Sequence, residues 1–122
     1  MILFLPWPPR ELSPNTRQHW ARLAKAKAHY RATCRVVAMD MAAGRKVASG
    51  SLAASIQFCP PNRRRFDRDN LLARMKSGLD GVCDALGIDD SRFASLTVTT
   101  GEVVRGGVVS VEIVALRQDA TR

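Results

Sequence analysis

Long apolar segments, paired cysteines and zinc-binding motifs are all missing from this sequence. No apolar run approaches the roughly 20 residues of a membrane-spanning helix, and the apolar start at 2–5 is stopped by Pro6 without a basic segment before it, so we expect neither a membrane span nor a signal peptide. The three cysteines, Cys34, Cys59 and Cys83, are odd in number and lack CxxC spacing, which argues against a disulfide framework or a zinc knuckle. We expect them to be small apolar core residues of a soluble cytoplasmic protein.

Acidic residues are also scarce, since 11 Asp and Glu stand against 19 Lys and Arg and leave a formal net charge of +8. An excess of this size indicates a polyanionic partner, and it favours nucleic acid over an acidic membrane. The arginines are spread along the chain, so the excess is not one solvated run. At 122 residues the chain is expected to form one domain, residues 1–122, around a single core.

The first half of the sequence predicts a strand and then a long helix. Residues 2–5 are apolar and run into Pro6-Trp7-Pro8-Pro9, which is typical of a short strand followed by an extended segment. Residues 13–16 have helix-start chemistry, and the predicted helix ends near Gly44. Its apolar seam consists of Trp20, Leu23, Lys27, Tyr30, Cys34, Val37 and Met41. A neighbouring basic stripe of Arg22, Lys25 and His29 either lies against phosphates or is an ordinary solvated face.

The second half predicts a strand, a helix and two further strands. Every second residue is apolar over 51–59, which indicates a half-buried strand, and a helix then runs from Leu71 to a C-cap at Gly87. β-branched residues mark strands at 96–99 and 108–116, and the turn residues between them predict a hairpin. The order β-α-β-α-β-β predicts an α+β fold, a small mixed β-sheet with two main helices.

The most unusual stretch, Arg63 to Asn70, reads Arg-Arg-Arg-Phe-Asp-Arg-Asp-Asn. If it is extended, Asp67 and Asp69 point to one side and can share a hard divalent cation, while the arginines meet phosphate. Alternatively, Asp and Asn here are helix N-caps in a solvated loop. A second acidic pair, Asp89-Asp90, follows the second helix and belongs either to the same site or to a simple turn.

Taken together, these features resemble the RusA-type Holliday junction resolvases, small basic endodeoxyribonucleases of bacteria and their prophages. The specific part is Asp-x-Asp-Asn at 67–70, followed after one helix by Asp89-Asp90. The resemblance covers nearly the whole chain, and its matching segments are Leu5-Pro6-Trp7-Pro8-Pro9, Ser13-Pro14-Asn15, Arg64 to Leu71, Leu79-Asp80 and Gly87 to Asp90.

The resemblance implies a Mg²⁺-dependent hydrolase, with Mn²⁺ as a substitute, that resolves four-way junctions by paired symmetric nicks in DNA recombination and repair. It implies a homodimer acting on branched DNA. It further implies that Asp67, Asp69 and Asp90 bind the metal and are catalytic. Three carboxylates supply only oxygen ligands, which suit Mg²⁺ or Mn²⁺ better than zinc. The role of Asp89 stays open.

The resemblance also implies a catalytic lysine on the helix after Asp-x-Asp-Asn, and Lys76 matches best. Lys76 lies two helical turns beyond Asp69, whereas the shortest family pattern has the lysine where this chain has Ala73. Arg74 is the alternative for this role. A surface pair with Asp80 is the other interpretation of Lys76.

DNA-binding residues are expected in the basic stretch and near the start of the first helix: Arg63, Arg64, Arg65, Arg68, Asn15, Arg17 and His19. No catalytic role is assigned to His19 or His29. The alternative function is a non-catalytic basic DNA- or RNA-binding module, in which the aspartates are caps and the arginines contact phosphate.

Overall fold

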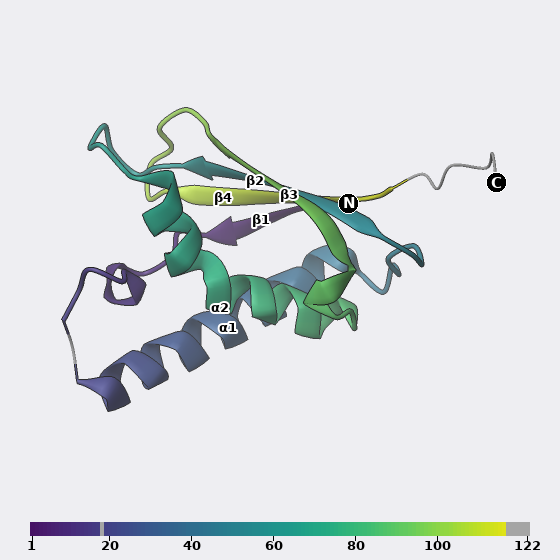
Figure 1. The fold of residues 1–122 in the computed structure, drawn as a ribbon, viewed down its shortest axis with the longest axis horizontal. Helices are drawn as coiled ribbons and strands as arrows, with labels where there is room; N and C mark the ends of the chain where they lie inside the picture. The colour runs from purple at the N-terminus through teal and green to yellow at the C-terminus, as the bar shows by residue number, and fades with distance from the viewer. Residues whose placement is uncertain (18, 117–122) are drawn as a thin grey trace.

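The computed structural model describes residues 1–17 and 19–116, which form a four-stranded sheet with two long helices on one side (Figure 1). The elements are β1 (Ile2–Pro6), η1 (Arg10–Leu12), α1 (Trp20–Ala42), β2 (Leu52–Cys59), α2 (Arg68–Leu86), η2 (Asp90–Arg92), β3 (Phe93–Thr100) and β4 (Val108–Ala115). The predicted α+β fold, a mixed sheet with two main helices, is confirmed. The order differs in detail, because the 3-10 helices η1 and η2 were not predicted.

The sheet has the strand order β1-β4-β2-β3, and its interior strands carry the core. Every second residue of β2 is buried, as the period of two predicts. In the antiparallel pairing of β2 with β4, Ile56 lies opposite Val111 and Phe58 opposite Val109, and all four side chains are buried. Their shared face is the one that the helices cover (Figure 1).

The predicted hairpin between the last two strands is wrong. β3 pairs in parallel with β2, whereas β4 pairs antiparallel with both β1 and β2. The connection passes the end of β2, where the amide of Gly101 donates to the carbonyl of Phe58 (2.8 Å) and that of Val104 to Pro60 (2.9 Å). Strand propensity does not choose a partner. The burial of apolar side chains determines which strands pair, so the more apolar β4 lies inside the sheet and the polar β3 lies at its edge.

Helix α1 begins at Trp20, later than predicted from residues 13–16. Those residues form a turn instead, in which the Thr16 amide donates to the Ser13 carbonyl (3.1 Å). Trp20 was expected in the apolar seam, but it is 76% exposed because the first turns of α1 lie away from the sheet (Figure 1). Of the predicted seam, Tyr30 and Cys34 are buried, while Val37 and Met41 are half-buried; further along the helix the buried residues are Ala38 and Ala42.

Helix α2 packs closely on α1 through two glycines. A Cβ atom at Gly78 would meet the Tyr30 ring at 2.5 Å, and one at Gly81 would overlap the main-chain carbonyl oxygen of Arg31. Because Gly78 and Gly81 have no side chain, the backbones of α1 and α2 can approach each other closely. Gly87 ends α2 as the predicted C-cap, with a left-handed φ of 66°.

The cysteines only partly match the prediction that all three belong to the core. Cys34 and Cys83 are buried, and burial raises the pKa of each thiol to about 11. Cys59 is half-buried, because it is the last residue of β2, where the strand leaves the core. Within residues 1–17 and 19–116, no helix has the length and apolar character needed to cross a membrane.

Candidate functional site

The arginine-aspartate stretch connects β2 to α2 and supplies the first turn of α2. The Asn62 side chain accepts a hydrogen bond from the Arg64 amide (2.9 Å), which turns the chain after the strand. Phe66 is half-buried and packs edge-on against Trp7, with 5.4 Å between the ring centroids. Phe66 thus anchors the stretch, while the side chains of residues 63–65 are exposed.

Asp67 is the N-cap of α2. Its Oδ1 accepts hydrogen bonds from the amides of Asp69 (2.8 Å) and Asn70 (3.4 Å). Asp67 thus has the N-cap role that was one of the two interpretations of the motif, and one of its carboxylate oxygens is bonded to the helix backbone. Asp69 lies in the first turn, where a negative charge interacts favourably with the helix dipole.

Because Asp67 caps α2, the Asp67→Ala variant should lower the free energy of unfolding by about 1 kcal/mol. Asp67→Asn should lower it much less, since an asparagine side chain caps almost as well. Urea unfolding of both variants beside the wild type measures the difference. Equal losses in the two variants would contradict a capping role.

A cavity of about 600 Å³ lies between α2 and the face of the sheet formed by β2, β3 and β4. Its walls are largely apolar, and they include Leu96 on the edge strand β3, which is 47% exposed. The polar side chains of the lining come mainly from α2 and the turn after it: Asp69, Lys76, Asp80 and Asp90. An apolar hollow with a few charged groups at its rim is a common form of binding site.

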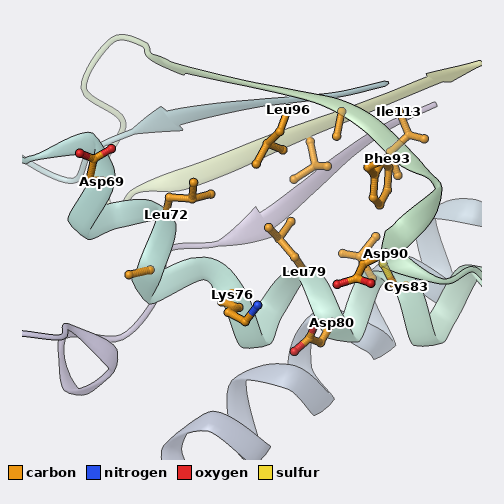
Figure 2. Close-up of a pocket in the computed structure, with 14 residues that line it drawn as sticks. Asp69, Leu72, Lys76, Leu79, Asp80, Cys83, Asp90, Phe93, Leu96 and Ile113 are labelled. Atoms are coloured by element: carbon orange, nitrogen blue, oxygen red, sulfur yellow. The ribbon is translucent and has the colours of Figure 1, made fainter. Parts of the chain in front are cut away.

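The charged groups are unevenly distributed along this cavity. Figure 2 shows Asp80 and Asp90 toward the C-terminal part of α2, Lys76 near the middle of the helix and Asp69 at the opposite end. After burial, the charges of Asp90 and Asp80 are the largest causes that raise the pKa of the Cys83 thiol, which places both carboxylates near that residue. Lys76, Asp80 and Asp90 therefore line the same cavity, with Asp80 and Asp90 beside Cys83.

The three predicted metal ligands are not assembled around one point. Asp67 lines a different cleft from Asp69 and Asp90, and those two lie at opposite ends of the cavity (Figure 2). Among the residues whose positions are described, no group of three His, Cys, Asp or Glu side chains is arranged to hold a metal ion. As they stand in one chain, these residues do not fit a shared cation.

The second acidic pair divides between two roles. Asp89 caps η2, and its Oδ1 accepts a hydrogen bond from the Ser91 amide (2.9 Å). That backbone hydrogen bond is the main cause that lowers the pKa of Asp89. Asp90 is exposed and lines the cavity. Asp89 therefore shapes the turn, and of the two residues Asp90 is the one that lines the cavity.

Lys76 and Arg74, the two alternatives for the catalytic cation, lie on different sides of α2. Lys76 is exposed and lines the cavity with the carboxylates. Arg74 is only 8% exposed, does not line that cavity, and donates from Nη2 to the carbonyl of Pro8 (2.7 Å). Only Lys76 is placed to act beside Asp80 and Asp90.

A second cleft, of about 480 Å³, lies at the N-terminal end of α2 and is basic. Its charged residues are Arg10, Arg64, Arg65, Arg74 and Asp67, so four guanidinium groups face one carboxylate. The sequence interpretation missed Arg10 and did not place Arg74 in this cleft. Arg74 had a usable signal, because it falls on the apolar face of α2 beside Leu71 and Met75, where a charged residue is unusual.

The predicted DNA-binding residues are only partly gathered in this cleft. Arg64, Arg65 and Asn15 line it. Arg63, Arg68 and Arg17 are exposed but do not line it. His19 serves as the N-cap of α1, where its Nδ1 accepts from the Ala21 amide (3.2 Å), and its ring lies 5.5 Å from that of Trp20.

These features define a small basic α+β protein in which α2 separates a basic cleft from an apolar cavity with carboxylates and a lysine. No family model matches the chain. It is 43% identical over 121 residues to an uncharacterized protein of Xylella fastidiosa, an alignment that covers 98% of this chain and 79% of that protein. The chain belongs to the same family as the Xylella protein.

Proposed function

We propose that the chain is a Mg²⁺-dependent endodeoxyribonuclease that resolves four-way DNA junctions by paired symmetric nicks, as the RusA-type resolvases that it resembles do. In this proposal Mn²⁺ can replace Mg²⁺, and a homodimer acts on branched DNA. The protein then works in the cytoplasm, in DNA recombination and repair.

The observation that carries the proposal is the placement of opposite charges on the two sides of α2. One side carries the basic cleft with Arg64 and Arg65, and the other carries Lys76 with Asp80 and Asp90. Arginines bind phosphate strongly because the guanidinium group donates several hydrogen bonds in one plane. In this proposal a strand bound in the cleft passes over α2, so that one of its phosphates reaches the carboxylates and the lysine on the other side of the helix.

The roles of the side chains follow from their chemistry. The arginines orient the strand through its phosphates, which contributes affinity without reading sequence. The ammonium group of Lys76 stabilises negative charge that develops on the phosphate during cleavage. Because Asp67, Asp69 and Asp90 do not converge in one chain, the need for a cation rests on the resemblance alone.

Cleavage of a synthetic four-way junction decides between the enzyme and its alternative. The proposal expects cutting with Mg²⁺ or Mn²⁺, none with chelator, and little cutting of linear duplex of the same sequence. Junction binding without cutting at any metal concentration would refute the endonuclease.

The alternative is a non-catalytic basic DNA- or RNA-binding module. One observation favours it, namely that Asp67 and Asp89 act as caps for α2 and η2. In that case the junction is bound but never cut, and a double-stranded or single-stranded RNA competes for the same arginines. Affinity should fall steeply with salt under both functions, so salt dependence does not separate them.

If Lys76 stabilises charge during cleavage, Lys76→Met should lower kcat by roughly 100-fold with little change in junction affinity. Arg74→Met should instead affect binding, because Arg74 lies in the basic cleft. Single-turnover cutting and gel-shift titration on the same preparations measure the two effects. Normal cutting by Lys76→Met would remove the lysine from the mechanism.

The paired nicks require two sites, which a two-fold dimer supplies. Light scattering at micromolar concentration should therefore give a mass near twice 13.4 kDa. A cruciform plasmid should be linearised rather than left as nicked circles. A monomeric mass with nicked circles as the sole product would contradict the paired mechanism.

A further inference from the structure

Arg74 is a buried cation that forms no ion pair with any residue that the structure describes. Its side chain is 8% exposed, and its guanidinium carbon lies 6.0 Å from the centroid of the Trp7 ring. Its Nη2 donates to the carbonyl of Pro8, but Nε is buried and has no hydrogen-bond partner. In the part of the chain that the structure describes, no carboxylate pairs with it. Burying a charge in this way is costly unless an opposite charge joins it.

The surroundings of Arg74 add positive charge. Arg10, Arg64 and Arg65 line the same cleft. Burial is the main cause that lowers the pKa of Arg74, the charge of Arg10 lowers it further, and the interactions with Tyr30 and Glu11 act in the opposite direction. Asp67 is the single acidic residue that lines the cleft, and its Oδ1 already accepts two amide hydrogen bonds. The cleft thus has an excess of hydrogen-bond donors and cations.

Neutral polar groups complete the lining. The hydroxyl of Ser13 donates to Oδ1 of Asn70 (3.3 Å), which ties the turn before α1 to the first turn of α2. Asn15 and Asn62 lie at the same cleft and offer amide groups. The volume, about 480 Å³, exceeds what a lone phosphate needs and leaves room for the sugar attached to it.

We infer that this cleft is a binding site for a phosphate group, with the Arg74 guanidinium at its floor and Arg10, Arg64 and Arg65 around it. The anion supplies the negative charge that the buried guanidinium lacks. Phosphate suits the site because its oxygens accept several hydrogen bonds from planar guanidinium groups. The inference deepens the proposed function, since the phosphate would belong to a DNA strand held beside α2, although the binding can be measured without any cutting.

The first test is the binding of inorganic phosphate at constant ionic strength, by calorimetry and by thermal shift against chloride. Wild type should bind phosphate and melt at a higher temperature in its presence. Arg74→Met, which keeps an unbranched apolar stem over Trp7, should weaken binding about tenfold or more. Arg35→Gln, which removes one charge from the exposed face of α1, is the matched control and should bind like wild type.

A second variant keeps the inference falsifiable if Arg74→Met does not fold. Arg10→Gln with Arg64→Gln changes only exposed side chains of the cleft and should weaken phosphate binding by a similar factor. Binding that is equally strong in this double variant and in Arg35→Gln would overturn the inference. So would the absence of phosphate binding by the wild type.

Competition identifies the source of the phosphate. A short single-stranded thymidylate oligonucleotide should displace inorganic phosphate from wild type, as expected if the site holds a strand phosphate. If the oligonucleotide binds without displacing it, the strand assignment is overturned and the site takes free phosphate. If Arg74-dependent phosphate binding is found but no junction is cut, the proposed enzyme fails and this site stands.

Discussion

Asp90→Asn and Asp69→Asn should each reduce junction cutting by roughly 100-fold or more, the scale of a lost catalytic carboxylate. Both side chains are exposed and line the cavity, so neither substitution removes a core contact. Junction affinity should stay unchanged or tighten, because phosphate affinity comes from Lys and Arg and each variant loses one negative charge. Single-turnover cutting and gel-shift titration on the same samples measure the two effects.

Asp40→Asn is the control for this prediction, since Asp40 is exposed on α1 and lines neither the cavity nor the cleft. It removes the same charge and should leave cutting as in wild type. If Asp69→Asn and Asp90→Asn both cut normally, these two carboxylates have no part in catalysis. A loss in Asp90→Asn alone would place the chemistry at the end of the cavity near Lys76 and Asp80.

Gly81→Ala should destabilise the fold by about 3 kcal/mol. The new Cβ would overlap the main-chain oxygen of Arg31 and lie 3.0 Å from the amide nitrogen of Arg35. These are backbone atoms of α1, so the overlap is relieved only if the helices separate. The expected fall in Tm is on the order of 10 °C.

Ala73→Gly is the control for helix propensity, since Ala73 is exposed on the same helix. It should cost about 1 kcal/mol, the usual difference between alanine and glycine in a helix. Thermal and urea unfolding of both variants give the comparison. A Gly81→Ala variant as stable as wild type would contradict the close approach of α1 and α2 at this position.

Local pattern alone determined most of the elements of this protein. The strand at 52–58 follows from the alternation of apolar residues, and the end of α2 at Gly87 follows from the ability of glycine to adopt a left-handed conformation. Both depend on residues close in the sequence, so both could be predicted. The α+β class followed from their order. The Asp-x-Asp-Asn motif likewise marked the start of α2 as a candidate site.

Contacts between segments that are distant in the sequence decided the strand order and the positions of the charged side chains. β4 lies between β1 and β2, and not beside β3, because sheet order depends on which strands bury most apolar surface, which no turn sequence records. The motif places Asp67 and Asp69 two residues apart, yet the first turn of α2 sends them to different clefts. Arg74 and Lys76 also diverge, because two residues on a helix differ by about 200° in direction. Only the packing of α2 against the sheet and the Pro8 segment made one a buried cation and the other a group in the cavity.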